Sequence, residues 1–510
     1  MGLKNLTIIQ KALSHIDGIA SIDELYEKAD VEDKKVWKYI SGKNTEGVFQ
    51  SESDMMKGII DMIHPTCFDD LGAINSLGRP GPLAAGMPAD YGERKNDKQE
   101  ISYPIRGCED ILDNTYDTIP YQEQLMLISQ RIAGFNDMQA DSLTRKTIAK
   151  KKVAMMPMLI RCHIFGKLNC EGPEGWEDDM HAPWYDPKGK YGGEIEGAIK
   201  RGYTEAEVLD YFHTIEKFSS YCFNKSHSAC YAYIGFLTAW LKHYYPAEFM
   251  AAVLSMQDTP EKVSHYVDVC EQKMGLTIKT PDVNISEEDF TPNGTTILYG
   301  LGSVKSVGDK SIPEIIANRP YAGVEDAVAR IPKKAFNKAV GENLIKAGAF
   351  DWENQNRIAL INAFHAIRKD KCEPMDSTFI DEDIIISFEK ATLGVPITYK
   401  PWWDQIKAGE KITAYGSIRE INERNDKRGK LMAFPKLKIN GCEIDALMFS
   451  SKYARHAIEI NNRYMQQYEY EFEFTGKKDE KGKLLLDSVT AIKKEETALE
   501  EIMQGGTEVA

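Results

Sequence analysis

The chain has 510 residues, of which 42% are hydrophobic and 28% charged, and its formal net charge at pH 7 is −15. These proportions exclude a wholly disordered, collagen-like or coiled-coil chain, and the length predicts about three domains. The acidic balance excludes nucleic-acid binding through the overall field, so any such binding would depend on local basic patches. The nine cysteines are scattered and never form CxxC, which indicates free thiols in a reducing cytoplasm.

The first residues of the chain predict an amphipathic helix rather than a signal peptide. Leu6, Ile9 and Leu13 lie on one side at helical spacing, and no basic segment precedes an apolar core. We expect this apolar side to need a partner surface that covers it. The most apolar stretch, residues 230–254, is interrupted by charged residues and Pro246, so no membrane span is expected.

Further helices are predicted over residues 122–135 and 204–223, where apolar residues recur at three- and four-residue spacing. Thr204 and Glu207 have the spacing of a capping box at the start of the second of these helices. Residues 170–193 are dense in glycine, proline and aspartate and predict a surface loop.

The last part of the chain differs from the first in its predicted secondary structure. Residues 260–352 predict short helices joined by glycine turns, and the acidic residues 370–388 predict a linker. From Lys411 onward five strand-like runs follow one another, with a helix predicted between the third and fourth at about 450–466. This order matches a small Greek-key barrel of the OB type. Residues 493–510 predict a polar tail.

The densest basic cluster comprises Arg145, Lys146, Lys150, Lys151 and Lys152. At 100° per residue on a continuous helix, these side chains lie on one face or beside it and can converge on one polyanion. A solvated helix face would explain a lone lysine run, but this cluster is isolated in an acidic chain. We therefore regard it as a phosphate-binding candidate.

A second polar cluster, Asn224, Lys225, Ser226 and His227, stands directly before a long apolar helix. Such a cluster can direct hydrogen-bond donors toward a phosphate or a base edge. Simple helix capping by Asn or Ser is the alternative, and spacing alone favours it.

Arg79 is the only charged residue in GRPGPLAAG (78–86), where prolines and glycines predict a rigid turn. Its guanidinium offers a fork for phosphate or carboxylate. A turn with no binding role explains the segment equally well.

Residues 298–316 predict two helices joined by a Ser-Val-Gly hairpin at 306–308. Exposed backbone N–H groups of such a hairpin can bind a DNA phosphate without reading sequence. A glycine-rich turn alone would be weak evidence, but flanking lysines and the later segment 343–351 favour a helix-hairpin-helix element. The residues expected to contact DNA are Lys305, Ser306, Gly308 and Lys310.

The barrel segment adds a basic turn followed by an aromatic residue, a combination that suits single-stranded nucleic acid. A polar hairpin turn is the alternative. The residues concerned are Arg424, Lys427, Arg428, Lys430 and Phe434.

Motifs typical of zinc sites and of nucleophilic catalysis are weak or missing in this sequence. Cys162, His163, Cys170 and His181 lie close in sequence, but their spacing fits no standard zinc module, and no zinc site is expected. The sequence contains neither GxSxG nor the phosphate-binding GxxxxGK[ST] pattern.

Several long motifs follow one another in a recognisable order. They are GVFQSESDMMKGII (47–60), LGRPGPLAAGM (77–87), YQEQLM (121–126), the cluster at 145–152, EKFSSYCFNKSHSACYA (216–232) and LKHYYPAEFMAAVL (241–254). Together they closely resemble the fingers of the bacterial replicative DNA polymerase III alpha subunit, a C-family polymerase. YGLGSVKSVG (299–308) and LIKAGAFD (344–351) resemble its helix-hairpin-helix region, and TLGVPIT (392–398) with the barrel resembles its OB module.

The resemblance implies a mainly α-helical fingers domain, then a helix-hairpin-helix region, then a small all-β OB-like barrel. The implied bounds are 1–45 for an N-terminal helical segment, 46–258 for the fingers, 259–370 for a helix-hairpin-helix DNA- and clamp-binding region, 371–404 for a linker, 405–493 for the OB-fold and 494–510 for a tail.

By the same resemblance, the fingers hold the incoming deoxynucleoside triphosphate (dNTP) and the template–primer, and a sliding clamp is a partner. Implied nucleotide and phosphate contacts are Arg79, Arg145, Lys146, Lys150, Lys151, Lys152, Asn224, Lys225, Ser226 and His227. Implied DNA contacts are Lys305, Ser306, Gly308, Lys310, Arg428, Lys430 and Phe434. Packing or orienting residues nearby would be Tyr121, Gln122, Glu123 and Gln124.

The chain also departs from the family. Members begin with a PHP domain and a palm that holds three catalytic aspartates, whereas residues 1–9 align just after the last of these. The Mg²⁺ that phosphoryl transfer requires is therefore expected only in an assembled polymerase, not in this chain alone. Ser306 replaces a usual glycine, residues 170–193 form an extra loop, and no clear clamp-binding peptide is present.

Three hypotheses follow. The first is that the chain is the C-terminal part of a cytoplasmic DNA polymerase, a nucleotidyltransferase, whose palm is supplied by a separate chain. The second is a non-catalytic DNA-binding accessory protein, and the third is a truncated remnant. In each case we expect this chain alone to be inactive in DNA synthesis.

Overall fold

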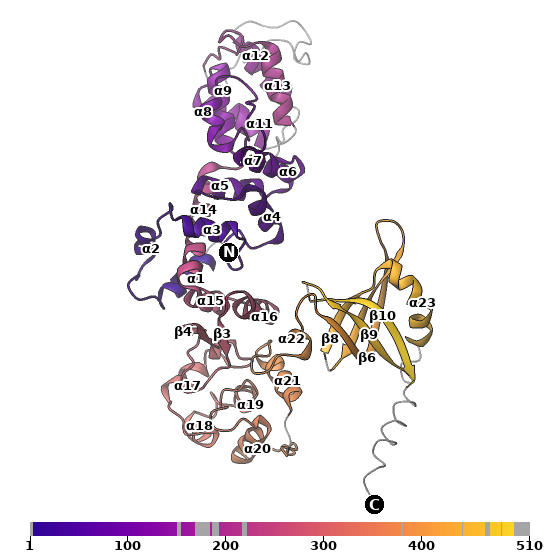
Figure 1. Ribbon diagram of the computed structural model, residues 1–510. Coiled ribbons are helices and arrows are strands. Elements are labelled where there is room, and N and C mark those ends of the chain that lie inside the picture. The colour runs from indigo at the N-terminus through magenta and orange to yellow at the C-terminus, as the bar shows by residue number, and fades with distance from the viewer. Residues whose placement is uncertain are drawn as a thin grey trace, which may run out of the picture. The chain divides into compact units, whose positions relative to one another are not determined.

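The computed structural model describes residues 4–149, 155–168, 184–185, 193–216, 222–378, 381–440, 442–464, 470–480 and 482–493. The chain divides into two compact units, which are described separately (Figure 1). Unit 1 runs to Thr277 and includes Phe290–Ile297, and unit 2 comprises Ile278–Asp289 and the residues from Leu298 onward.

Unit 1 is helical, which confirms the prediction for the first part of the chain. Its helices are α1 (Lys4–Leu13), α2 (Ile22–Lys28), α3 (Lys34–Ser41), α4 (Asp54–Ile63), α5 (Phe68–Leu77), α6 (Pro80–Ala84), α7 (Met87–Lys95), α8 (Glu109–Leu112), α9 (Gln122–Ala133), α10 (Asp137–Gln139), α11 (Lys146–Ala149), α12 (Met156–Phe165), α13 (Glu205–Glu216), α14 (Lys225–Tyr244), α15 (Pro246–Ser255) and α16 (Pro260–Asp268). The described part of unit 1 also contains π-helical turns at Ala140–Arg145 and Val269–Lys273, a 3₁₀ turn at Asp113–Thr115 and two short paired strands, β1 (Lys167–Leu168) and β2 (Trp184–Tyr185). No helix in the described ranges is long and apolar enough to cross a membrane.

The apolar side of α1 is not left for a partner, so that expectation was wrong. Ile9 and Leu13 are buried, and α1 packs on α14 and α15 of the same unit. The amphipathic pattern was read correctly, but the surface that covers it lies more than 200 residues later in the chain, at the helices that begin at Lys225 and Pro246.

The predicted capping box at α13 is confirmed. The Thr204 hydroxyl accepts a hydrogen bond from the Glu207 N–H (3.2 Å), and the Glu207 carboxylate accepts one from the Thr204 N–H (2.7 Å). The predicted loop at 170–193 lies almost wholly outside the described residues, as do Cys170 and His181 of the discounted zinc set.

His163 belongs to a hydrophobic core that gathers residues from Ile105 to Cys222. Its side chain is completely buried, and Nδ1 lies 2.8 Å from the Leu159 carbonyl while Nε2 lies 2.8 Å from the Ser129 hydroxyl. Burial lowers the pKa of His163 to about 4, so the ring is neutral near pH 7. Both ring nitrogens are occupied by hydrogen bonds, which indicates a structural residue.

Unit 2 begins with short helices and ends in a barrel. The three-stranded sheet with order β3-β5-β4 lies where the chain passes between the units, with β3 at Thr277–Lys279, β4 at Thr291–Asn293 and β5 at Thr296–Leu298. A 3₁₀ turn at Leu301–Ser303 is followed by α17 (Ile312–Ala317), α18 (Val324–Arg330), α19 (Lys338–Lys346), α20 (Arg357–Arg368), α21 (Glu382–Thr392) and α22 (Trp402–Gln405).

The predicted linker 371–404 contains a folded helix, which corrects that prediction. In α21 the side chains of Ile385 and Ile386 are buried, and Glu389 at the same face is fully buried. The Arg357 guanidinium donates to Glu389 (2.9 Å) and binds Asp351 with two nitrogens (2.9 and 2.6 Å). The acidic composition concealed this helix, because one of its carboxylates is paired in the interior instead of facing solvent.

The five predicted strands and the helix between them are confirmed. They are β6 (Lys411–Asn425), β7 (Leu431–Ile439), β8 (Cys442–Leu447), α23 (Ser450–Tyr464), β9 (Tyr470–Lys478) and β10 (Leu484–Lys493). The strands pair in the order β10-β8-β7-β6-β9, and β9 pairs back with β10 to close an OB-like barrel. Gly416 pairs with both β7 and β9, and a Cβ there would lie 2.2 Å from the Lys438 carbonyl, so only glycine fits this bend.

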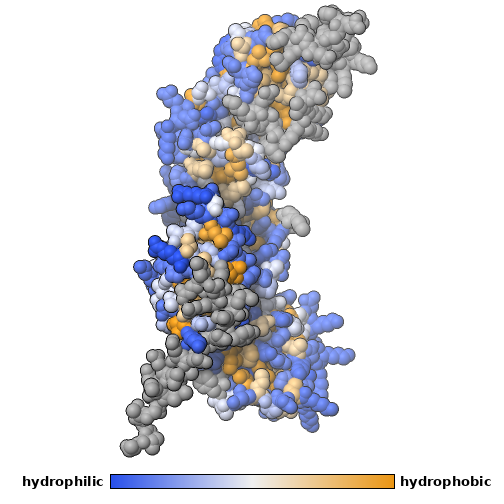
Figure 2. Space-filling model, turned by 90° about the vertical axis from the view of Figure 1, so that its right-hand side faces the viewer, coloured by the Kyte–Doolittle hydropathy of each residue, from blue (hydrophilic) through white to orange (hydrophobic). Residues whose placement is uncertain are grey.

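The surface shows no single dominant apolar area on the face drawn in Figure 2. Hydrophobic residues there occur in small groups between hydrophilic ones. Scattered groups of this kind are normal for a globular surface, so the binding candidates have to be judged from individual side chains.

Candidate nucleic-acid interface

The start of α14 is tied to the start of α9 by one carboxylate. The Asn224 side-chain amide donates to Glu123 Oε1 (2.8 Å), and the Lys225 backbone N–H donates to Glu123 Oε2 (2.9 Å). Asn224 Oδ1 accepts a hydrogen bond from the His227 N–H (2.9 Å), so Asn224 is the N-cap of α14. The capping interpretation of this polar cluster is therefore confirmed, while the side chains of Ser226 and His227 are exposed.

The segment that precedes α9 fixes this junction. The Phe223 N–H donates to the Pro120 carbonyl (2.7 Å), and the Gln122 N–H donates to the Phe223 carbonyl (2.9 Å). Gln124 closes the start of α9 by accepting a hydrogen bond from the Tyr121 N–H (3.2 Å). A Cβ at Gly72 in α5 would lie 3.1 Å from the Tyr121 hydroxyl, so the small residue there allows the close approach. These contacts agree with the packing and orienting places implied for residues 121–124.

Arg79 reaches the same junction from another part of the chain. Its guanidinium carbon lies 4.1 Å from the centre of the Phe223 ring, and the side chain has no carboxylate partner within the described residues. The predicted rigid turn after it is in fact the short helix α6, which begins at Pro80 because proline suits the first helical position. Arg79 is therefore exposed, oriented by an aromatic ring and available to an anion.

Arg145 and Lys146 share a partner that the sequence analysis missed. Arg145 pairs with Asp141, and the Lys146 ammonium lies 3.0 Å from the other Asp141 oxygen. The hydrogen bond that Arg145 donates to Asp141 raises the pKa of Arg145. The π-helical turn that ends at Arg145 packs against α9, the helix that begins at the junction. The four-residue spacing of Asp141 and Arg145 was the available signal.

The single continuous helix assumed for residues 145–152 is not observed. Arg145 ends a π-helical turn and Lys146 begins α11, so the rotation per residue changes between them. Lys150, Lys151 and Lys152 lie outside the described residues.

The junction as a whole has an excess of positive charge. The residues described above comprise four cationic side chains (Arg79, Arg145, Lys146 and Lys225) and two carboxylates (Glu123 and Asp141), a difference of +2. The Lys225 ammonium also lies 5.7 Å from the centre of the Tyr121 ring. The cations, the exposed His227 and a helix N-terminus together can hold an anion such as a polyphosphate. We call this group of residues the junction cluster.

The predicted hairpin is present in unit 2, but a 3₁₀ turn takes the place of its first helix. Ser306 adopts a left-handed backbone conformation with φ +68°, the region that glycine occupies without strain. The Lys305 N–H donates to the Thr392 carbonyl, and the Lys305 carbonyl accepts from Asn343, so α19 and α21 support the hairpin. Lys305, Ser306, Gly308 and Lys310 are all exposed.

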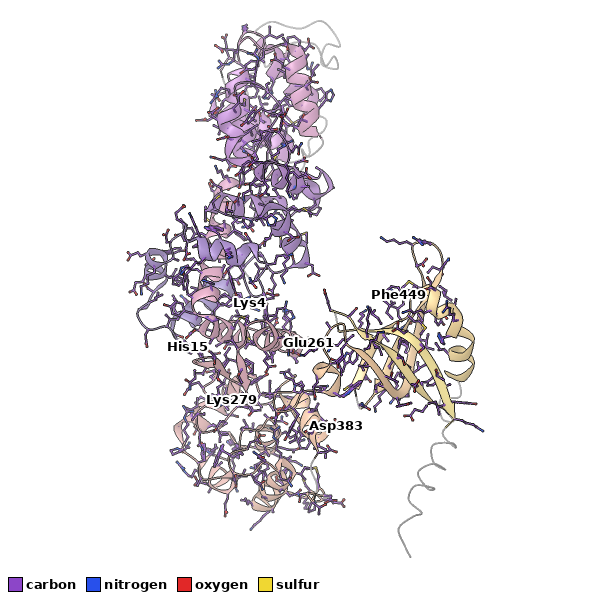
Figure 3. The ribbon with its side chains drawn as sticks, viewed as in Figure 1. Lys4, His15, Glu261, Lys279, Asp383 and Phe449 are labelled. Carbon is purple, nitrogen blue, oxygen red and sulfur yellow. The ribbon has the colours of Figure 1, made fainter. Side chains whose placement is uncertain are left out.

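The basic turn of the barrel joins β6 to β7. The Asp426 carboxylate accepts hydrogen bonds from the N–H groups of Arg428 and Lys430 (2.8 and 2.9 Å), so it shapes the turn and leaves both side chains exposed. Phe434 is only half-buried and lies under the Arg424 guanidinium (5.9 Å). Phe449, labelled in Figure 3, follows β8 and is 46% exposed. Sequence reasoning missed this aromatic residue, although the alternation of β8 would have placed it outside.

Across the described ranges, no group of three or more His, Cys, Asp or Glu side chains could hold a metal ion.

Comparison with known proteins agrees with this arrangement. The family described as the bacterial DNA polymerase III alpha subunit finger domain matches residues 5–161, and a helix-hairpin-helix motif matches residues 275–360. The chain is therefore similar to the C-terminal portion of the bacterial DNA polymerase III alpha subunit. The resemblance stated from the motifs is thereby confirmed, as is the order of fingers, hairpin region and OB-like barrel.

Individual relatives are similar to most of this chain. DNA polymerase III subunit alpha of Aquifex aeolicus is 32% identical over 491 residues, which cover 90% of this chain and 39% of the relative. The protein of the same name from Campylobacter jejuni is 34% identical over 420 residues (81% and 32%), and that from Escherichia coli K12 is 33% identical over 475 residues (85% and 38%). The chain thus spans less than half the length of the relatives it matches.

Proposed function

We propose that this chain is the C-terminal part of a replicative DNA polymerase and binds the incoming dNTP and the template–primer. A separate chain would carry the catalytic palm. The observation that carries the proposal is the convergence, at the α9–α14 junction, of residues from three separate motifs of the polymerase fingers: Arg79, Arg145 with Lys146, and Asn224 with Lys225.

In this proposal the junction cluster receives the triphosphate. Arg79 has no carboxylate partner within the part of the chain that the structure describes, and it can present two parallel N–H groups to a phosphate. Glu123 holds Asn224 and the first turn of α14 in place, so the positive end of that helix faces the same anion. Arg145 and Lys146 retain Asp141 as a partner and would add charge instead of directional hydrogen bonds.

DNA would be bound by the two other predicted elements. The exposed hairpin around Ser306 offers backbone N–H groups and two lysines to a duplex phosphate, without sequence preference. The β6–β7 turn and Phe434 of the barrel suit a single strand. A sliding clamp is a further proposed partner.

No step of the proposal passes through a metal ion held by this chain. The expected Mg²⁺ would accompany the palm-bearing chain.

The test measures binding first and catalysis second. Binding of a fluorescent dNTP to the full chain is compared with that of a double variant, Arg145→Ala with Lys225→Ala. The matched control is Lys35→Ala with Lys38→Ala, which removes two exposed charges from α3. We expect at least a tenfold loss for the junction variant and no loss for the control. Equal binding by both variants would refute the nucleotide-binding role.

Primer extension then separates the hypotheses. Synthesis only when the chain is mixed with a palm-bearing polymerase chain would establish the divided enzyme. Synthesis by the chain alone would show that metal-binding carboxylates lie outside the described residues.

The accessory DNA-binding protein remains the second candidate, because the exposed hairpin lysines and the basic barrel turn need no nucleotide to act. It predicts DNA binding that weakens steeply with salt, together with no dNTP affinity.

A further inference from the structure

Asn75, near the end of α5, has an amide group that the protein itself leaves unused. The residue is 8% exposed, and neither its side-chain oxygen nor its nitrogen makes a hydrogen bond. A buried amide without partners costs about 1–3 kcal/mol relative to one that is paired. An apolar residue at this position would avoid that cost, which suggests that the amide serves something that binds.

The amide lies on the wall of a cleft in unit 1. The cleft has a volume of about 780 Å³, which is within the range of small-molecule sites. Lys4 at the start of α1 (labelled in Figure 3), the segment from Gly47 to Met56, and Tyr266 on α16 form its other walls. All of these residues belong to unit 1.

The remaining groups in the cleft define the chemistry of a ligand. Phe49 and Tyr266 supply aromatic surface, and Lys4 and Arg79 supply positive charge. The one carboxylate, Glu52, already accepts a hydrogen bond from the Tyr266 hydroxyl (2.9 Å). An amide with a free donor and acceptor, aromatic surface and two cations are complementary to a base, its π-face and its phosphate.

Arg79 connects this cleft to the junction cluster. It lines the cleft and also lies over Phe223, the residue immediately before Asn224. A nucleotide in the cleft would therefore have its phosphate beside the cations that receive the triphosphate in our proposed function.

We propose that the cleft binds one nucleotide unit, with the Asn75 amide on the base edge, Phe49 or Tyr266 against the base and Arg79 on the phosphate. This inference rests on the proposed function and adds to it a base-binding residue. Adenine is a suitable probe base, because an amide can accept from its N6 amino group and donate to N7. A strand of DNA and a free nucleotide share this chemistry.

The test uses the full chain and two probes, a fluorescent oligodeoxyadenylate and dATP. Asn75→Leu removes the amide while keeping a side chain of similar size, and Asn44→Ala removes an exposed asparagine amide as the matched control. We expect Asn75→Leu to weaken binding of at least one probe by about tenfold, as loss of a bidentate base contact would. We also expect its thermal stability to equal or exceed that of the unmodified chain, whereas a structural amide would leave it less stable.

The outcomes distinguish the two proposals and the two ligand sources. Loss for the oligonucleotide alone assigns the cleft to a DNA strand, and loss for dATP assigns it to a free nucleotide. If the unmodified chain binds both probes and Asn75→Leu binds them equally well, this inference fails and the proposed function stands. If the unmodified chain binds neither probe, both fail.

A second measurement covers the case in which Asn75→Leu unfolds. An oligonucleotide carrying 8-azidoadenine is photo-crosslinked to the unmodified chain, and the labelled peptide is mapped by mass spectrometry. Crosslinks within residues 47–56, 75–80 or 253–266 support the inference, and crosslinks confined to other segments overturn it.

Discussion

Removal of the Glu389 carboxylate tests whether α21 is an integral part of the hairpin region. The carboxylate accepts hydrogen bonds from Arg357 (2.9 Å), from the N–H groups of Ile397 and Thr398 (2.5 and 2.9 Å) and from the Thr398 hydroxyl (2.5 Å). Glu389→Ala leaves the buried Arg357 with one carboxylate fewer and two N–H groups without an acceptor. Breaking a buried pair by removing one partner costs about 3–5 kcal/mol.

This loss of stability is large enough to measure in the unfolding transition of unit 2, which contains Glu389. At about 2–4 °C per kcal/mol for a unit of this size, the transition of unit 2 should fall by about 10 °C. Because the two units need not unfold together, hydrogen exchange of α19–α21 amides should accompany calorimetry.

Glu373→Ala, which changes an exposed glutamate outside any helix, is the control. The reasoning is refuted if the two variants shift the transition equally.

Two further expectations follow from single residues. Ser306→Gly should stabilise unit 2 by about 0.5–1 kcal/mol, because glycine adopts the left-handed φ of this position without strain. Denaturant unfolding measures this change, and a midpoint that is unchanged or lower would contradict the hairpin geometry. The pKa of His163 is lowered to about 4 by burial, so between pH 6.5 and pH 4 the unfolded chain binds a proton that the folded chain excludes. The contribution of His163 to the stability of unit 1 should be full above pH 6.5 and fall by up to about 3 kcal/mol as the pH is lowered through this window. Urea titrations at several pH values check this, because the difference in stability between the unmodified chain and His163→Gln should change by this amount over the window.

Elements with a strong local signal could be predicted from the sequence. The barrel strands alternate between buried and exposed residues, and the capping box of α13 depends only on Thr204 and Glu207, so neither requires knowledge of distant segments. The covering of α1 and the folding of α21 could not be predicted in this way. In each case the decisive contact is with a residue remote in sequence, such as Arg357 for Glu389.

For the candidate site, the sequence predicted which residues are involved but not which of them form hydrogen bonds and ion pairs with one another. Arg79, Arg145 and Lys225 were recognised as cations, yet sequence alone did not show that Glu123 joins two of the motifs. The π-helical turn before Lys146 altered the register on which the basic face was predicted. Asn75 carried no signal at all, because the lack of a hydrogen-bond partner is a property of the folded surroundings.

The buried pair between α20 and α21 has a consequence for a chain that has been cut. Residues 371–378 are mostly exposed and without helix or strand, so a protease would cleave there readily. The fragment that carries the barrel would still begin with α21, and its Glu389 would still occupy the Arg357 pocket. Such a nicked protein should migrate as one particle in native chromatography and separate into two pieces only on denaturation, so intact behaviour on a sizing column would be no proof of an intact backbone.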